Sequence, residues 1–451
     1  MTSAVNAAPE AGAGAPDGEL VARVQRRTVR TLLASQLFGS VGVAMAFAVS
    51  ALAATALAHS ATRAGVAQGI SAIGTIVATL VLAKLTVRSG RRPALSLGYL
   101  IAAVGGVVCV IAIAQRHFVA FVVGSALFAV ASATNLQARF AAVDLARAGR
   151  ISTNVSLVVW MATVGAVLGP QLATAGGYLA RGVDLPPWAG AYALSALAFL
   201  VAAVILAVFL RPDPLRLALS LTDAEARRRD PASPRPEGAP TRTPAGLREG
   251  IAAIRSSATA MIALGAAAVG QAVMIGLMIW TPLHMADSGQ GWIGVVLSGH
   301  LLGMYAFAPL LGWLADRVGK LLMVACGCLL MMVSLALAGM ATGQQHILLL
   351  VALWLLGVAW ALLLITGSGL FTEHIAPSHR AAAQGVFDGV VWTATAIANA
   401  VTGWLLDVAG YTLLCVGGMV AVALPATVVW LRFFAGAHRK PLQGDTASGE
   451  G

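Results

Sequence analysis

Residues 312–320 read GWLADRVGK and form a short charged segment between two long apolar runs. A less regular copy, residues 83–92, reads AKLTVRSGRR and also separates two apolar runs. Aligning Gly90 with Gly319 gives an offset of 229 residues, about half of the chain. A basic turn that recurs in this way indicates an internally duplicated membrane protein, an organisation that many transporters share.

The composition is that of a membrane protein. Hydrophobic residues make up 59% of the chain and charged residues 10%, with a mean hydropathy of +0.84, whereas soluble proteins carry roughly a quarter charged residues. Apolar runs of about 20 residues cross a bilayer as helices, because the backbone must satisfy its own hydrogen bonds there. The runs are continuous rather than alternating, which excludes a strand barrel. We expect twelve membrane helices, at roughly 31–57, 64–86, 93–114, 118–141, 152–180, 188–210, 257–281, 291–313, 321–341, 346–371, 382–406 and 411–434.

The basic residues predict the orientation. With twelve crossings both chain ends share one side, and 26 of the 29 Lys and Arg fall on it; Arg63, Arg116 and Arg181 are the exceptions. Because basic loops stay in the cytoplasm, we expect both termini there. The same asymmetry accounts for the net charge of +11. Arg outnumbers Lys 26 to 3, which suggests a GC-rich bacterial genome and hence a bacterial inner membrane. The basic residues are scattered through short loops, so a nucleic-acid partner is not expected.

Five segments are expected along the chain. They are a cytoplasmic tail (1–30), a six-helix bundle (31–210), a linker (211–255), a second six-helix bundle (256–435) and a second tail (436–451). The linker is rich in proline and mixed charges, so we expect a solvated tether. A surface helix over 215–229 is the alternative. The first apolar run is too long for a cleavable signal peptide.

Metal, cofactor and enzyme chemistry are not expected. Cys326 and Cys328 lie two residues apart in a predicted helix and point to different faces, unlike metal ligands. We find no metal-spaced His/Glu cluster, no carboxylates paired at one depth and no Ser-His-Asp set.

The segment 312–320, between the eighth and ninth predicted helices, resembles the signature loop of the major facilitator superfamily. Its copy lies between the second and third helices, where that family also has one. The resemblance implies an all-α integral membrane fold: two pseudo-symmetric six-helix bundles with a substrate cavity between them at mid-membrane.

In that family such loops form a charge cluster that latches the cytoplasmic side closed. Asp316 can accept from Arg317 or from a helix N-terminus. Asp144 and Glu373, which recur at the 229-residue offset, are natural partners for the basic members. Val87 replaces the acidic residue in the first copy, so its arginines can simply pair with Asp144. The alternative is that these charges only enforce topology. The charged gating residues expected are Arg88, Arg91, Arg92, Asp144, Asp316, Arg317, Lys320 and Glu373.

Residues 165–170, GAVLGP in the fifth helix, resemble the antiporter signature of drug-exporting members. Gly165 and Gly169 permit close helix approach, and Pro170 frees a backbone carbonyl, which implies a pivot. The pattern departs from the signature at Ala173 and Thr174. The exporters' arginine early in the fourth helix is absent, and Arg139 lies near the other end of that helix.

Ionisable residues within membrane helices are costly and usually functional. Asp388, among apolar neighbours in the eleventh helix, is the leading candidate for a proton carrier. Its alternatives are an acid facing cytoplasmic water or a partner of Arg139. His300 can titrate near neutral pH, or simply pack. Arg139 can hold a substrate anion, regulate Asp388, or bridge to Asp144. Residues suited to contact a substrate are Gln36, Arg139, Trp160, Gln271, Tyr305, Trp360, Trp392 and Asn399.

These features predict a secondary active transporter that works as a monomer in the lipid bilayer. We expect proton-coupled efflux, by antiport, of a small amphipathic drug-like compound or secondary metabolite, as in drug resistance. The alternatives are a proton-coupled importer or facilitator of a small metabolite, and a membrane receptor built on the same fold. Few charged residues are available to a cavity, which disfavours a strongly ionic substrate.

Overall fold

The computed structural model describes residues 15–59, 61–229, 246–285 and 290–437, and this part of the chain contains helices and no strands. The N-terminal half comprises α1 (Ala15–Ala58), α2 (Ala61–Ser89), α3 (Arg91–Ala114), α4 (Phe118–Phe128), α5 (Val130–Ala141), α6 (Ile151–Arg181) and α7 (Pro187–Phe209), with a 3₁₀ turn at Ala148–Arg150. The connection contributes α8 (Pro214–Arg229) and α9 (Leu247–Ser256). The C-terminal half comprises α10 (Ala258–His284), α11 (Gln290–Tyr305), α12 (Ala308–Val318), α13 (Lys320–Met340), α14 (His346–Glu373) and α15 (Pro377–Ala437).

The all-α membrane fold expected from the apolar runs is confirmed. Within the described residues, eleven segments are long and apolar enough to cross a membrane. The predicted run 382–406 is not among them, although it lies in α15. That helix joins the last two predicted runs and bends at Gly410, whose φ is 74°. The fourth predicted helix is divided at Ala129, between α4 and α5, and the eighth between α11 and α12.

The ends of the two bundles differ from the expected division. Residues 15–30, expected in the N-terminal tail, continue α1. Residues 214–229 form α8, so this part of the expected tether is helical, as in the alternative. Residues 247–256 form α9, which packs against α15. The rest of the expected linker, and the tail after residue 437, lie outside the described residues.

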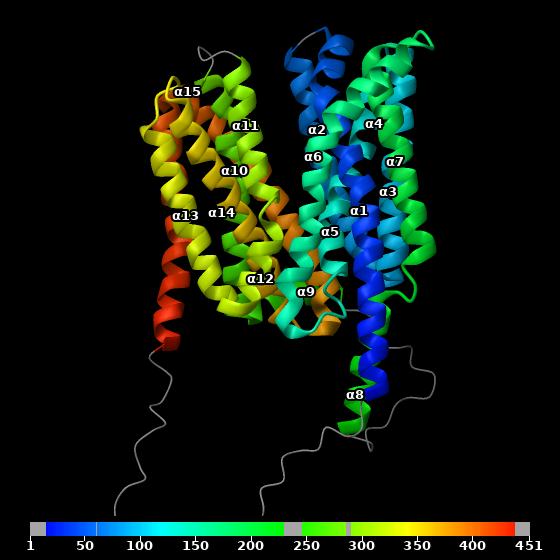
Figure 1. Ribbon diagram of the computed structural model, residues 1–451, viewed down its shortest axis with the longest axis vertical. Coiled ribbons are helices and arrows are strands. Elements are labelled where there is room, and N and C mark those ends of the chain that lie inside the picture. Colours follow the sequence, from blue (N-terminus) through cyan, green and yellow to red (C-terminus); the bar gives the residue numbers. More distant parts are fainter. Residues whose placement is uncertain (1–14, 60, 230–245, 286–289, 438–451) are drawn as a thin grey trace, which may run out of the picture.

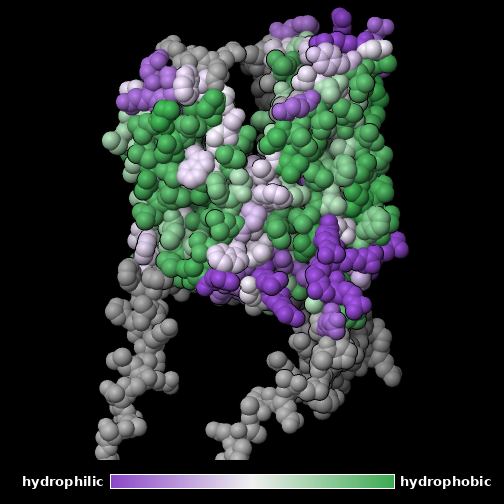
Figure 2. Space-filling model, viewed as in Figure 1, coloured by the Kyte–Doolittle hydropathy of each residue, from purple (hydrophilic) through white to green (hydrophobic). Residues whose placement is uncertain are grey.

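The helices divide their surfaces between lipid and protein. On α3, for example, Leu100, Val104, Val107 and Ile111 are 43–50% exposed, while Tyr99 is fully buried. The exposed residues recur every three or four positions and form one apolar stripe. Figure 2 shows a hydrophobic band across the visible face of the molecule, bounded by hydrophilic residues at both ends. The band is the surface expected to meet the hydrocarbon layer.

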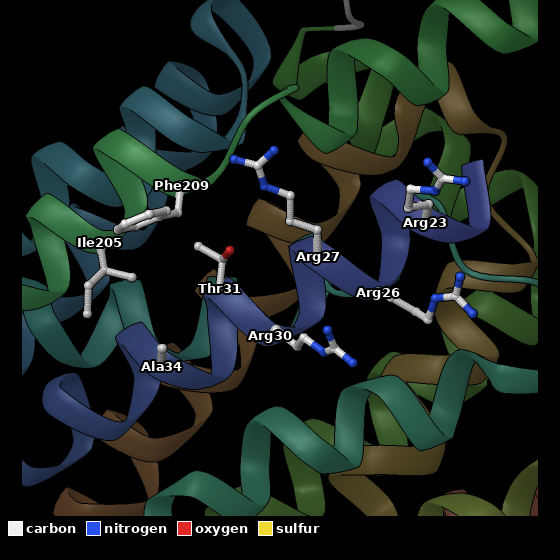
Figure 3. Close-up of a pocket in the computed structure, with 8 residues that line it drawn as sticks. All are labelled: Arg23, Arg26, Arg27, Arg30, Thr31, Ala34, Ile205 and Phe209. Carbon is white, nitrogen blue, oxygen red and sulfur yellow. The ribbon is translucent and has the colours of Figure 1, made fainter. Parts of the chain in front are cut away.

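The two halves stand side by side, with the start of α1 and the end of α15 at the same end of the molecule (Figure 1). We call this the basic end, because Arg23, Arg27 and Arg30 of α1 lie there (Figure 3). Here α2 packs against α15 and α6 against α12, so the halves are in contact. At the opposite end Figure 2 shows the molecule hollowed between the halves. The structure is therefore closed at the basic end.

Small residues allow the halves to approach. A Cβ added to Gly312 of α12 would lie 2.6 Å from the carbonyl oxygen of Ser152, and it would also collide with Ser156 of α6. A Cβ added to Gly385 of α15 would collide with the Cβ of Ala83 in α2. Both contacts join one half to the other with little more than backbone between them. Closure of the basic end therefore depends on the absence of side chains at these positions.

Within the N-terminal half, the glycines of the GAVLGP segment have the packing role expected of them. A Cβ on Gly165 would lie 2.6 Å from backbone atoms of Ser40, and one on Gly169 would lie 2.5 Å from the Cβ of Ala44. Both contacts fasten α6 to α1. The backbone of α6 continues through residue 170, whose side chain is outside the described set.

Replacing Gly385 with valine should open the basic end. The added side chain collides with Ala83, and overpacking of this kind costs about 1–3 kcal/mol, enough to shift a two-state population several-fold or more. Spin labels at Arg88 of α2 and Arg317 of α12, both exposed, would report the distance between the halves. We expect a longer distance in Gly385→Val and no change in Gly265→Val, because Gly265 has open space around it. An unchanged distance in Gly385→Val would show that this contact does not control closure.

Candidate transport site

A buried ion pair joins the two halves. Arg139 lies in the last turn of α5, and Asp388 lies three turns into α15. The Arg139 Nη2 donates to Asp388 Oδ1 at 2.5 Å, and both side chains are 1% exposed. Arg139 thus contacts Asp388, which is 249 residues away in the chain, and not Asp144, which was the sequence-based alternative. The pair can exist only while the halves are together.

The surroundings of this pair are aromatic. The Arg139 guanidinium lies 4.5 Å from the centre of the Phe140 ring and 5.8 Å from that of Phe387. Phe371 of α14 packs on Phe387 with 4.8 Å between ring centres. The aromatic faces stabilise the guanidinium but supply no donor to the carboxylate. Two charges in such surroundings have lost their hydration, so each depends strongly on the other.

The hydrogen-bonding capacity of the Arg139–Asp388 pair is only partly used within the described residues. Arg139 Nε donates to Ser368 Oγ of α14 at 3.2 Å. Among the described residues, however, Asp388 Oδ2 and Arg139 Nη1 are buried without a hydrogen-bond partner. An ionised carboxylate usually accepts on both oxygens, and an unsatisfied buried oxygen is costly. The Asp388 carboxyl is therefore buried with one oxygen unsatisfied within the described part of the chain.

A second group of charges closes the basic end in the N-terminal half. Arg91, at the start of α3, makes two hydrogen bonds to the Asp144 carboxylate, at 2.8 and 3.1 Å, and a further one to Gln384 of α15. Burial raises the pKa of the Asp144 carboxyl, and the Arg91 guanidinium opposes that shift. The carboxylate therefore relies on Arg91 to stay ionised, and Arg91 in turn contacts the opposite half.

In the C-terminal half, Asp316 caps the start of α6. Its carboxylate accepts from the backbone amides of Ser152 and Thr153, at 3.1 and 2.8 Å, and from the Thr153 hydroxyl. These amides are unpaired donors at a helix N-terminus, where a negative charge is favoured. Lys320 then joins Asp316, at 3.0 Å, to Glu373, at 2.8 Å. This cluster also crosses between the halves.

The remaining predicted gating residues lie outside these two clusters. Arg88 and Arg317 are exposed, and Arg317 stacks on Trp313 of its own helix at 4.3 Å. Arg92 donates to the backbone oxygen of Ala207, and its amide bonds to Asp213. Arg92 therefore ties α3 to the last turn of α7 and to the segment after it, within one half.

A cavity of about 260 Å³ lies in the N-terminal half between α1, α2, α4, α5 and α7, and one residue of α15 reaches it. That residue is Trp392, whose indole nitrogen is buried without a hydrogen-bond partner among the described residues. The other aromatic and hydroxyl-bearing lining residues are Phe47, Ser50, Ser71, Thr75, Phe121, Ser125, Phe128, Ser132 and Tyr192. None of the lining residues is charged. The surface suits an aromatic, uncharged molecule with a few polar groups.

The predicted substrate residues are divided among several places. Only Trp392 lines this cavity. Gln271 accepts from the Trp360 indole at 2.6 Å, and Tyr305 packs edge-on against Trp360, so these three form one cluster in the C-terminal half. Gln36 lies within 3.4 Å of the Tyr99 hydroxyl, inside the N-terminal half.

Four other candidates are placed as follows. Trp160 is 37% exposed on α6. His300 is fully buried in α11, where its Nδ1 contacts the Leu353 oxygen at 2.8 Å. Its Nε2 is buried without a hydrogen-bond partner among the described residues, and its proton role stays a prediction. The side chain of Asn399 lies outside the described residues, and Arg139 is occupied by Asp388.

Sequence reasoning missed the serines and threonine of the cavity. A signal was present, because Ser71 and Thr75 are four residues apart, and Ser125 and Ser132 are seven apart, so each pair lies on one helix face. However, Ser71 and Thr75 also donate to carbonyls of their own helix. Such local bonding is common for hydroxyls in apolar helices, so spacing alone does not distinguish a cavity wall from a packed interface.

Replacing one partner of the Arg139–Asp388 pair should destabilise the protein more than replacing both partners. Asp388→Asn leaves a buried, unpaired guanidinium, and Arg139→Gln leaves a buried, unpaired carboxylate; loss of one partner costs about 3–5 kcal/mol. The double variant leaves two neutral amides and should recover most of that loss. Thermal unfolding of the purified proteins would measure this coupling, with the exposed Arg88→Gln as control. A double variant less stable than either single variant would contradict the pairing.

Comparisons with known proteins agree with this architecture. The profile of the Major Facilitator Superfamily matches residues 32–299 and 284–450. The uncharacterized MFS-type transporter YddS of Bacillus subtilis is 32% identical over 412 residues, covering 90% of this chain and 91% of its own length. The riboflavin transporter RfnT of Brucella anthropi is 26% identical over 395 residues, covering 86% and 92%. Among solved structures, the human organic anion transporter MFSD10 superposes with a TM-score of 0.68 at 17% identity, covering 90% of this chain and 99% of its own. The chain therefore belongs to the major facilitator superfamily and is a multi-pass membrane transporter.

Proposed function

We propose that this transporter exports small, uncharged, amphipathic compounds with an aromatic portion, in exchange for protons. The observation that carries the proposal is the Arg139–Asp388 pair, because a titratable group there joins the two halves and is buried when they meet. The state of the basic end then depends on whether Asp388 holds a proton. A transporter that works by alternating access needs such a link between its coupling ion and its conformation.

The exchange follows from the charges. With Asp388 ionised, its attraction to Arg139 stabilises the closed basic end. A proton that reaches Asp388 from the hollow at the opposite end neutralises the carboxyl and weakens the pair, so the basic end can open. Substrate then enters the cavity from the basic end, and Asp388 releases its proton to the same side. Deprotonation restores the ion pair, and the molecule closes around its substrate and releases it at the opposite end.

The expected orientation gives this cycle its direction. Basic loops remain in the cytoplasm, so the basic end would face the cytoplasm and the hollow would face outward, in the bacterial inner membrane. Under that orientation the inward proton gradient drives the substrate out. The close packing of Gly165 and Gly169 on α1 is the surface on which the antiporter-like segment of α6 would pivot.

The lining of the cavity supports the substrate class. Aromatic rings offer stacking surfaces, and the hydroxyls of Ser71, Thr75 and Ser132 retain lone pairs that can accept a hydrogen bond. The free Trp392 N–H adds a donor from the other half. An ionic substrate would lose its hydration without gaining a partner there. Because Arg139 is held by Asp388, we assign it to coupling and not to binding of a substrate anion.

Transport of a flavin-like heterocycle is a second candidate. RfnT is named as a riboflavin transporter and is similar over most of both chains. Riboflavin combines an uncharged aromatic ring system with several hydroxyls, which matches the aromatic and hydroxyl lining of the cavity. The two candidates share a binding chemistry and are separated by whether the chain transports riboflavin.

The proton role is tested with Asp388→Asn. In everted membrane vesicles with an imposed pH gradient, the wild-type chain should accumulate a probe such as riboflavin or chloramphenicol against its gradient. The variant should lose at least about 90% of gradient-driven transport but keep probe binding, because its amide cannot carry a proton. Accumulation by right-side-out vesicles would instead favour uptake. Unchanged uphill transport by the variant would remove Asp388 from the mechanism.

The cavity is tested with Trp392→Ala. Loss of the ring and its N–H should weaken probe binding by roughly ten-fold or more, about the value of one aromatic contact with a hydrogen bond. Proton coupling should be intact, so transport at saturating probe should fall much less than affinity. Trp160→Ala is the matched control, because Trp160 does not line the cavity. Equal losses of affinity in both variants would argue against this cavity as the binding site.

A further inference from the structure

A second hollow, of about 620 Å³, lies at the basic end between residues 23–34 of α1 and the last turns of α7. Four arginines of α1 line it together with two apolar side chains of α7, Ile205 and Phe209. In Figure 3, Arg27 extends beside Thr31, near the end of α7 where Phe209 lies. The transport cycle described above uses none of these residues.

The arginines carry charge that their own half does not balance. They occupy positions 23, 26, 27 and 30, so they recur within two turns of α1. Arg23 makes one long, exposed contact to Glu19, at 3.8 Å. Among the described residues, Arg26, Arg27 and Arg30 have no ion pair with a carboxylate. A group of exposed cations of this kind attracts a polyvalent anion.

The other side of the hollow is apolar and faces outward. Val204, Val208 and Phe209 of α7 are 50–52% exposed and form one stripe. Figure 2 shows that hydrophilic residues of the basic end directly adjoin the hydrophobic band. The hollow therefore lies where the headgroups of a bilayer would be, with hydrocarbon on one side. An anion that binds here would gain from carrying an apolar chain.

We infer that this hollow is a binding site for an acidic phospholipid. Its phosphate would lie beside Arg27, in the field of the neighbouring arginines, and an acyl chain would follow Ile205 and Phe209 along α7. Basic pockets between membrane helices at a headgroup surface bind anionic lipids in this manner. A free phosphate could use the arginines but not the apolar stripe, and a nucleic acid would be excluded by the adjoining hydrocarbon. The lipid would hold the projecting start of α1 against α7.

The test uses the full chain, purified in detergent and titrated with dioleoyl phosphatidylglycerol, with bound lipid counted by native mass spectrometry. The variant is Arg27→Gln with Arg30→Gln; both positions are exposed, so folding should be unaffected. We expect lipid binding to weaken by roughly 30-fold, since each arginine at a membrane surface contributes about a five-fold gain in affinity. Arg147→Gln with Arg150→Gln is the matched control, because both arginines are exposed and lie outside the hollow. Retained binding in the control supports the site.

Three other arms complete the experiment. Phosphatidylcholine should bind much more weakly than phosphatidylglycerol, inorganic phosphate should not displace the lipid, and Phe209→Ser should weaken lipid binding several-fold. An equal loss of lipid binding in the two double variants would show that binding depends only on the net charge of the protein, and would overturn the inference. Equal binding of both lipids, displacement by phosphate, or an unaffected Phe209→Ser variant would each overturn the inference.

Discussion

Desolvation of two opposite charges is the constraint on which the closed arrangement depends. Arg139 and Asp388 come from different halves, and each would be costly to bury alone, so their burial is acceptable only when the halves bring them together. Aromatic rings around them exclude water and leave the carboxylate few other partners. The contact between the halves therefore depends directly on this pair of charges.

The duplication provides the geometry that brings those charges together. Arg91–Asp144 and Lys320–Glu373 are equivalent pairs, each with partners 53 residues apart. The close contacts are equivalent too, because Ala83 and Ser156 in one half correspond to Gly312 and Gly385 in the other. Gly312 lies against Ser156, and Gly385 lies against Ala83. Each contact therefore pairs a glycine in the C-terminal half with a small side chain in the N-terminal half. The glycine is on α12 in one contact and on α15 in the other.

Much of this fold follows from local rules, whereas the site depends on partners that are distant in the chain. Run length and composition predict the helices, and Gly90 and Gly319 both adopt the positive φ that a tight turn between helices requires. Asp144 and Glu373 could be recognised by their common offset. The partner of Arg139 could not be recognised from the sequence. Asp144 is only five residues away and was the obvious local partner, whereas the actual partner, Asp388, is 249 residues away. Likewise, Ser71 and Thr75 of the cavity donate to carbonyls of their own helix and so resemble structural residues.

Departures from the repeat explain why, within the described part of the chain, Arg139–Asp388 is the one ion pair that crosses between the halves. Residue 368 is the repeat counterpart of Arg139, and the two side chains are in contact at 3.2 Å. A faithful repeat would place a second guanidinium there, against the first, and two buried like charges repel strongly. Serine at that position removes the repulsion and adds an acceptor. Asp388 has Val159 as its counterpart, so no second carboxylate competes for Arg139. The Arg139–Asp388 pair therefore depends on differences between the two halves at these positions.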